Sequence, residues 1–149
     1  MGKPDNRRDI LLAEDDLDDV EIFEMALNDL ALSYEIRHAK NGDQLLELLR
    51  ERVPYILFLD IRMPCRDGIA CIIEIRKHRE YDRLPVIMYT SHQSKKIMET
   101  CFREGANFYM QKPDSIRELT GNLRKIFAID WTSDLHFPPE DQFVISAGS

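Results

Sequence analysis

Short apolar runs alternate with longer amphipathic segments along the first 127 residues of the chain. The runs predict strands over residues 10–13, 34–39, 55–59, 86–90 and 107–111, and the segments predict helices over 17–30, 43–51, 69–78, 94–104 and 115–127. The helical period is clearest where Ile116, Leu119 and Leu123 recur on one face. This regular alternation predicts an α/β fold, in which a parallel sheet carries helices on both faces.

The end of the chain, residues 130–149, does not continue this alternation. It combines two prolines with Trp131, Phe137, Val144 and Ile145. Because aromatic residues are rare in disordered segments, we expect this C-terminal extension to pack on the domain or on a partner subunit, the alternative being a frayed end. We therefore expect a polar lead over residues 1–8, one domain over residues 9–129, and an extension without an output domain.

Composition narrows the class of protein. Hydrophobic residues at 44% and charged residues at 32% are ordinary for a globular protein, and no apolar stretch approaches the roughly twenty residues that span a bilayer. The polar start lacks the apolar core of a signal peptide, so we expect a cytoplasmic protein without a membrane partner. The net charge of −7 argues against nucleic-acid binding, which needs a basic surface. Cys65, Cys71 and Cys101 are predicted to be reduced, structural thiols.

Asp60 marks the abrupt end of the apolar run that starts at Tyr55, and a turn with Pro64 and Gly68 follows it. Ligand sites of open α/β sheets lie just beyond the carboxyl ends of the strands. Asp60 is therefore a candidate for chemistry, although for this residue alone a helix cap or a turn is an equally good interpretation.

Three further carboxylates, Glu14, Asp15 and Asp16, follow the first predicted strand and so belong to the same edge of the sheet as Asp60. Carboxylates packed together are unfavourable unless a cation or shared protons compensate. Mg²⁺ suits so few protein oxygens, because it keeps several waters and commonly bridges carboxylates to a phosphate. Asp16 is better interpreted as the N-cap of the first helix.

Two other strand ends add a hydroxyl and an ammonium group, Thr90 and Lys112. An aspartate that attacks a phosphoryl group forms an acyl phosphate, and the transferring oxygens need positive charge and hydrogen-bond donors around them. Alone, Thr90 is typical of a strand end and Lys112 of a solvated charge. At successive strand ends, together with the acids, they predict a phosphoryl-transfer site.

Together these residues resemble the receiver domain of two-component response regulators, over about residues 9–129. Glu14 and Asp15 match the acidic pair of the family, and Asp60 matches its phospho-accepting aspartate. The other matching positions are Pro64 and Gly68, four and eight residues beyond the acceptor, Thr90 as the switch hydroxyl, Tyr109 as the switch aromatic, and Lys112 with the following Pro113. The resemblance implies a flavodoxin-like (βα)5 three-layer sandwich, with a five-stranded parallel sheet in the order 2-1-3-4-5.

The resemblance also implies a reaction. A sensor histidine kinase or a phosphotransfer protein would donate a phosphoryl group to Asp60, with Mg²⁺ held by Glu14, Asp15, Asp60 and the backbone carbonyl of Arg62. The domain would catalyse only its own phosphorylation and dephosphorylation, and we do not expect it to be an enzyme in any other sense.

The output implied by the resemblance is conformational. The phosphoryl group would draw Thr90 and Lys112 inward, and Tyr109 would turn inward with them. The change would reach a partner-binding face formed by the fourth helix, the fifth strand and the fifth helix. The peptide bond between Lys112 and Pro113 is typically cis in this family.

Arg62 and His92 occupy positions that tune the lifetime of the phosphoryl group in the family, two residues after the acceptor and two after the switch hydroxyl. Both are large hydrogen-bond donors here. We expect them to cover the phosphoryl group and to slow its hydrolysis, the alternative being exposed side chains without effect.

Several alternatives stay open at this point. A stand-alone receiver acts either as a diffusible regulator of an unknown downstream protein or as a shuttle in a phosphorelay, and the extension or the output face offers a surface for a homodimer. A metal-dependent phosphatase is a second class, but such enzymes commonly carry an aspartate where Arg62 stands. A flavodoxin-like cofactor binder is disfavoured, because acids occupy the place of a phosphate-binding loop.

Overall fold

The computed structural model describes residues 8–132 and 136–145. The predicted polar lead, apart from Arg8, and parts of the extension lie outside the described residues. The strands are β1 (Arg8–Ala13), β2 (Tyr34–Ala39), β3 (Ile56–Leu59), β4 (Val86–Thr90), β5 (Phe108–Gln111) and β6 (Val144–Ile145). The helices are α1 (Leu17–Asn28), α2 (Gly42–Glu51), α3 (Gly68–Ile75), α4 (Lys95–Arg103) and α5 (Ile116–Phe127), with two short 3₁₀ turns, η1 (Arg79–Tyr81) and η2 (Glu140–Gln142).

The sheet is parallel throughout, and its strand order is β2-β1-β3-β4-β5-β6. The predicted order of the first five strands is confirmed. The predicted count of five is wrong, because Val144 and Ile145 pair with Tyr109 and Met110 and add a sixth strand. Two residues are too few to show a strand period, so the pairing becomes visible only in the folded chain.

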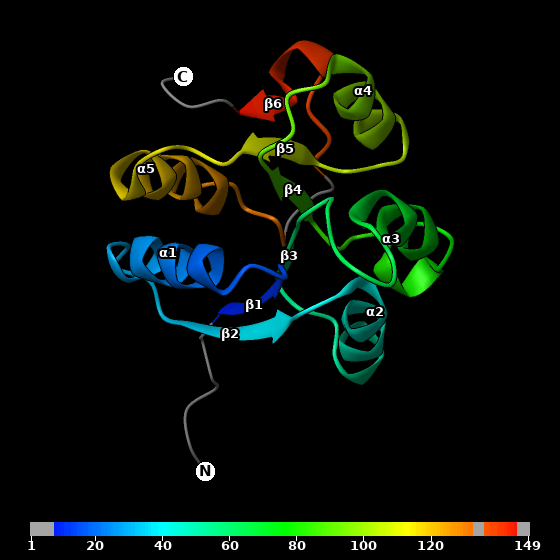
Figure 1. Cartoon of the computed structure of the whole chain (residues 1–149), viewed down its shortest axis with the longest axis horizontal. Coiled ribbons are helices and arrows are strands. Elements are labelled where there is room, and N and C mark those ends of the chain that lie inside the picture. Colours follow the sequence, from blue (N-terminus) through cyan, green and yellow to red (C-terminus); the bar gives the residue numbers. More distant parts are fainter. Residues whose placement is uncertain (1–7, 133–135, 146–149) are drawn as a thin grey trace.

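Helices cover both faces of the sheet, with α1 and α5 on one side and α2, α3 and α4 on the other (Figure 1). Successive residues of a strand point to opposite faces, and both faces are buried. In β1, Leu11 belongs to the apolar cluster under α2 and α3, whereas Ile10 and Leu12 belong to the cluster under α1 and α5. The three-layer α/β sandwich is therefore confirmed.

The helices begin where short polar side chains cap them, and these caps are Asp16, Asn41, Asp67, Ser94 and Ser115. The interpretation of Asp16 as an N-cap is confirmed, since its carboxylate accepts from the backbone N–H of Asp18 at 2.9 Å. Helices α1 and α3 end two or more residues earlier than predicted, at Asn28 and Ile75. Beyond these ends the apolar spacing continues, but the backbone forms turns whose hydrogen bonds join residues three apart. One example is the bond from the Leu30 N–H to the Leu27 carbonyl, at 3.0 Å.

The C-terminal extension crosses from one face of the sheet to the other. Trp131 packs with the α5 cluster, and its indole N–H donates to the Ile126 carbonyl at 3.0 Å. Phe143 packs on the opposite face against Phe102 and Tyr109, with ring centroids 5.2 and 6.3 Å away. The extension therefore packs on the domain, as one of the two predictions for it required.

A buried polar residue fastens the extension to the start of β5. The side-chain amide of Asn107 donates to the His136 carbonyl at 2.7 Å. Its carbonyl oxygen accepts from the Val86 N–H at 2.9 Å and from the Arg76 guanidinium at 3.0 Å. This side chain thus joins β4, the end of α3 and the extension through three hydrogen bonds.

Three smaller expectations are also tested. The described residues contain no cis peptide bond, so the expected cis bond between Lys112 and Pro113 is wrong for this structure, and the two isomers of such bonds are close in energy. The cysteines are free thiols; Cys71 and Cys101 are buried, which raises their pKa to about 12, whereas Cys65 is exposed. No helix within residues 8–132 and 136–145 is long and apolar enough to cross a membrane.

Candidate functional site

The carboxyl ends of four neighbouring strands bring the predicted site residues together. Glu14 follows β1, Asp60 follows β3, Thr90 ends β4 and Lys112 follows β5. Backbone bonds extend the sheet into this edge, from Asp60 N–H to the Ala13 carbonyl at 3.0 Å and from Lys112 N–H to the Thr90 carbonyl at 2.9 Å. The edge opens into a pocket of about 410 Å³, lined by Glu14, Asp15, Asp16, Asp19, Asp60, Arg62, Thr90, Ser91, His92 and Lys112.

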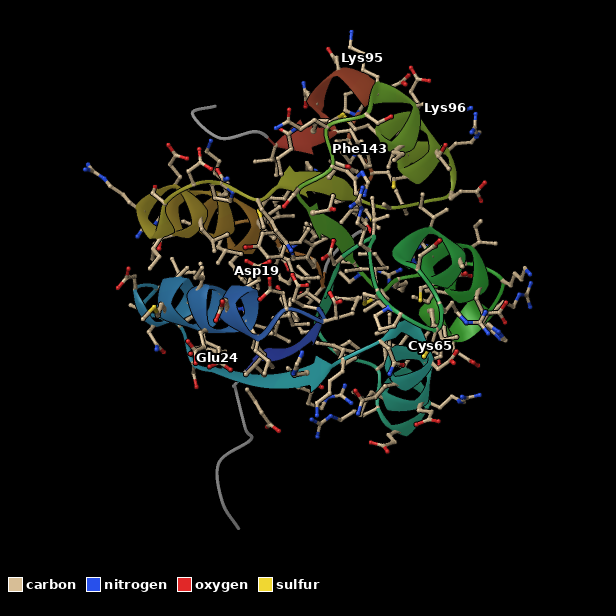
Figure 2. The ribbon with its side chains drawn as sticks, viewed as in Figure 1. Asp19, Glu24, Cys65, Lys95, Lys96 and Phe143 are labelled. Atoms are coloured by element: carbon tan, nitrogen blue, oxygen red, sulfur yellow. The ribbon has the colours of Figure 1, made fainter. Side chains whose placement is uncertain are left out.

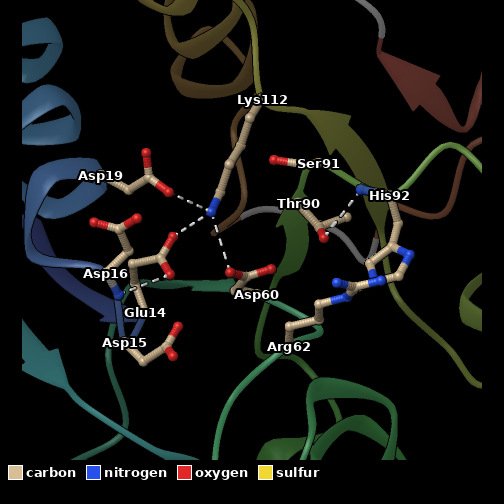
Figure 3. Close-up of a pocket in the computed structure, with 10 residues that line it drawn as sticks. All are labelled: Glu14, Asp15, Asp16, Asp19, Asp60, Arg62, Thr90, Ser91, His92 and Lys112. Atoms are coloured by element: carbon tan, nitrogen blue, oxygen red, sulfur yellow. Dashed lines mark hydrogen bonds and ion pairs between the residues drawn. The ribbon is translucent and has the colours of Figure 1, made fainter.

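The ammonium group of Lys112 lies among three carboxylates (Figure 3). It donates to Glu14, to Asp19 Oδ2 at 2.8 Å and to Asp60 Oδ2 at 3.1 Å. Burial alone would lower the pKa of Lys112, but hydrogen bonds to Asp19 and Glu14 and the charge of Asp60 outweigh it and raise that pKa. Lys112 is therefore a fixed positive charge beside the acceptor.

Glu14 is the most buried acid of the site and is fully covered from solvent. Its pKa is raised from 4.5 to about 8, chiefly by burial and also by the neighbouring Asp60, while Lys112 lowers it in part. Burial thus favours the neutral, protonated form of this carboxyl group. A buried acid whose charged form is disfavoured even beside Lys112 gains from further positive charge, so this position suits a metal ion.

Carboxylate oxygens of Glu14, Asp15 and Asp60 lie within 4.8 Å of one another. Such hard oxygen donors suit Mg²⁺, which needs few protein ligands. The predicted convergence of these three residues is thus confirmed, and their donor set fits the metal. The role of the Arg62 backbone carbonyl as a further ligand stays a prediction.

The start of α3 packs closely against the backbone of Asp60. A Cβ atom on Gly68 would lie 2.2 Å from the Asp60 carbonyl oxygen, so only glycine fits there. The Gly68 N–H donates to the Ile61 carbonyl at 2.8 Å, and the Ile61 N–H donates to Asp60 Oδ1 at 2.7 Å. These contacts fix one carboxylate oxygen and leave the other facing Lys112.

His92 connects the predicted switch residues with one another. Its backbone N–H donates to Thr90 Oγ1 at 3.4 Å, and its carbonyl accepts from the Tyr109 hydroxyl at 3.0 Å. Its ring accepts from Arg62 Nε at 2.7 Å, which places Arg62 and His92 together at the mouth of the pocket. Tyr109 is fully buried in this structure, and burial raises the pKa of its hydroxyl.

Sequence reasoning missed two residues of the pocket, Asp19 and Ser91. Asp19 lies in the first turn of α1, three residues after the N-cap Asp16. Residues three apart on a helix lie on the same face. Because Asp16 was predicted at the sheet edge, this spacing could have indicated that Asp19 also faces the pocket.

Two curated relatives share this part of the chain. The transcriptional regulatory protein KdpE of Staphylococcus aureus is 31% identical over 117 residues, which are 78% of this chain and 48% of KdpE. The transcriptional regulatory protein ZraR of Escherichia coli O157:H7 is 32% identical over 130 residues, which are 87% of this chain and 29% of ZraR. The chain thus spans at most about half the length of these relatives.

A solved structure, response regulator RPA3017 in red light signalling of R. palustris, is similar with a TM-score of 0.77 and 25% identity. The match covers 89% of this chain and 99% of that one. The family described as the response regulator receiver domain matches residues 10–124. The site agrees with that match, because four strand ends bring an acidic cluster, a hydroxyl and a lysine around one aspartate. The chain belongs to the response regulator receiver domain family.

Proposed function

We propose that this domain accepts a phosphoryl group on the carboxylate of Asp60. Receiver domains generally interact with histidine kinases or phosphotransfer proteins, which are the donors that we infer here. The observation that carries the proposal is the position of Asp60, whose oxygen lies 3.1 Å from the Lys112 ammonium and within 4.8 Å of oxygens of Glu14 and Asp15. A carboxylate held between a fixed cation and a cation site is prepared for a phosphoryl group.

In the transfer, one carboxylate oxygen of Asp60 forms a bond to phosphorus, and the bond from phosphorus to the donor's imidazole nitrogen breaks. The electron pair of that bond stays on the nitrogen, so the donor leaves as a neutral histidine after it takes up a proton. Lys112 faces the reacting carboxylate and stabilises the negative charge of the transferring oxygens. The N–H of Ile61 holds the other oxygen and orients the acceptor.

Receiver domains generally bind Mg²⁺ at an acidic pocket. Glu14, Asp15, Asp60 and the backbone carbonyl of Arg62 would hold it, and bound there it supplies positive charge next to the phosphoryl oxygens. For this, Glu14 has to release the proton that its raised pKa of about 8 retains in the metal-free site.

The signal would start at Thr90 and pass through the backbone of His92. A phosphoryl oxygen on Asp60 would accept the proton of the Thr90 hydroxyl, and turning that hydroxyl toward Asp60 would disturb the 3.4 Å bond that it accepts from the His92 N–H. Tyr109 joins the same loop to β5 through its hydrogen bond to the His92 carbonyl. We infer that the change reaches the face of α4, β5 and α5, where β6 now covers the edge of β5.

The test is intact mass after incubation with acetyl phosphate or phosphoramidate and Mg²⁺. We expect one added phosphoryl group on the wild-type protein, none on Asp60→Asn, and none on the wild-type protein after chelation of the metal. Asp18→Asn, which alters an exposed acid outside the pocket, is the matched control and should be phosphorylated like the wild type. A folded wild-type protein that gains no mass under these conditions contradicts the proposal.

A further inference from the structure

Asp19 lies in the first turn of α1 (Figure 2), and its side chain points toward Lys112 (Figure 3). It comes from the helix rather than from a strand end, and it is not one of the three acids whose oxygens converge as a cation site. Its carboxylate nevertheless accepts a hydrogen bond of 2.8 Å from the Lys112 ammonium. Asp19 is therefore joined to the acceptor through its bond to Lys112.

The ammonium group of a lysine has three protons to donate, and Lys112 uses all three. They go to Glu14, Asp19 and Asp60. The bond to Asp60, at 3.1 Å, is longer than the bond to Asp19, at 2.8 Å. The positive charge that faces the acceptor is thus shared with an acid on the other side of the pocket.

Asp19 and Asp60, which share the Lys112 ammonium, differ in their exposure to solvent. The Asp60 side chain is 8% exposed, whereas that of Asp19 is 30% exposed. A partly exposed carboxylate recovers water easily when it loses its partner, so the bond to Asp19 can be given up at low cost. Asp60 is too buried to be solvated in the same way.

We propose that Asp19 is a positioning residue, which draws the Lys112 ammonium toward α1 and thereby restrains phosphorylation of Asp60. This inference rests on the proposed phosphoryl transfer and concerns its regulation. When a phosphoryl group arrives, its oxygens need the donors of Lys112. Asp19 competes for these donors with its own negative charge, which also repels an anionic phosphoryl donor.

The first turn of α1 contains a matched control. Asp18 stands next to Asp19 and is equally close to the helix N-terminus, so both carboxylates interact favourably with the helix dipole. Asp18 is exposed, and it is not among the carboxylates paired with Lys112. Asp19→Asn and Asp18→Asn therefore remove the same charge from the same turn, but only one of them frees Lys112.

The experiment measures the rate at which acetyl phosphate and Mg²⁺ phosphorylate the full chain, by intact mass at timed intervals. In this reaction an Asp60 oxygen bonds to phosphorus, the bond from phosphorus to the acetate oxygen breaks, and acetate leaves with the electron pair. We expect Asp19→Asn to react about two- to fivefold faster than wild type, the range that one partly exposed ion pair covers. Asp18→Asn should react at the wild-type rate.

A second measurement reports on Lys112 itself. The nitrogen and proton resonances of its ammonium group, assigned by their loss in Lys112→Met, should shift in Asp19→Asn and stay in place in Asp18→Asn. A residue that only stabilises the fold would leave these resonances unchanged.

The outcomes separate this inference from the proposed function. If the wild-type protein is phosphorylated but Asp19→Asn reacts no faster than Asp18→Asn, or reacts more slowly, the restraint by Asp19 is overturned and the acceptor role of Asp60 stands. If the folded wild-type protein takes up no phosphoryl group, the proposed function fails and this inference fails with it.

Discussion

The acidic pocket and the C-terminal extension are built in opposite ways. The pocket collects polar residues from the ends of β1, β3, β4 and β5 and from the first turn of α1, and charge and hydrogen bonds hold them together. The extension is one continuous segment, held mainly by two buried aromatic side chains, Trp131 and Phe143. One region brings charges together at the edge of the sheet, and the other buries apolar surface on both of its faces.

The difference shows where stability and chemistry come from. Burial disfavours the charged form of Glu14, as its raised pKa indicates, so this acid at least is placed in the pocket at a cost to stability. The extension adds favourable apolar contacts without any group that takes part in the proposed transfer. Tyr109 belongs to both regions, because its hydroxyl bonds to the His92 carbonyl and its ring packs near Phe143.

The largest expected effect belongs to the extension. Phe143→Ala removes a side chain that is 1% exposed and leaves a cavity between α4 and β5. We expect the free energy of unfolding to fall by about 3–5 kcal/mol, the usual loss for a buried phenylalanine. Urea denaturation followed by circular dichroism measures this loss.

Phe137→Ala is the matched control in the same segment. Phe137 is 49% exposed and lies 5.9 Å from the Arg76 guanidinium, so its loss should cost no more than about 1 kcal/mol. Equal losses for the two variants would contradict the stabilising role of Phe143. A folded Phe143→Ala that is phosphorylated much more slowly than wild type would show that the extension and the pocket are coupled.

Ionisation of Glu14 is expected to have a smaller effect on the free energy of unfolding as the pH changes. In the native, metal-free protein its carboxyl group keeps its proton up to a pKa of about 8, whereas in the unfolded chain it ionises near 4.5. The native state therefore binds more protons between these values, and stability must fall as pH rises through this window. We expect a loss of about 2 kcal/mol from Glu14, less than full linkage between 4.5 and 8 would give, because this carboxyl group titrates together with Asp60 and Lys112.

Urea denaturation of metal-free protein at pH 5, 6, 7 and 8 measures this dependence, with Glu14→Gln as the control. The variant cannot ionise at this position and should lose less stability than wild type over the same range. A wild-type stability that rises with pH relative to Glu14→Gln contradicts the buried, protonated state of Glu14.

The smallest effect concerns the pair at the mouth of the pocket. Arg62→Ala and His92→Ala each break the 2.7 Å hydrogen bond between the two side chains and uncover the phosphoryl site. We expect phosphorylated Asp60 to lose its phosphoryl group about two- to tenfold faster in each variant, since one hydrogen bond contributes about 0.5–1.5 kcal/mol. The rate is measured by intact mass after removal of the phosphoryl donor.

Two residues of the same types serve as controls. Arg66 pairs with Asp43 and His78 pairs with Glu74, both away from the pocket. Arg66→Ala and His78→Ala should leave the lifetime unchanged. If the Arg62 and His92 variants also keep the wild-type lifetime, the pair does not cover the phosphoryl group.

The strand ends could be predicted well from the sequence, because residues next to one another in the chain are enough to mark them. An apolar run that stops at Asp60 or Thr90 marks both the strand and the residue at its end. Parallel strands then bring these ends to one edge, so the meeting of Glu14, Asp60 and Lys112 follows from the strand order. The cap at Asp16 was equally local, because an N-cap bonds within its own first turn.

The wrong or missing predictions depend on contacts between distant segments. Helix periodicity ran past Asn28 because Leu30 stays buried in a turn after the helix has ended. The ion pair of Asp19 joins residues 93 positions apart in the chain, so no local pattern shows that Lys112 reaches it.

By itself, the sequence determined the α/β class and the order of the elements. It also determined which acids, hydroxyl and lysine stand at the strand ends. Hydrophobic periodicity and abrupt changes of polarity are properties of neighbouring residues, so both can be recognised without the fold. Only the tertiary structure decided that β6 extends the sheet beyond β5 and that Lys112 is shared between Asp19 and Asp60. A two-residue strand and a divided ammonium group depend on distances between segments, and those distances exist only after the chain has packed.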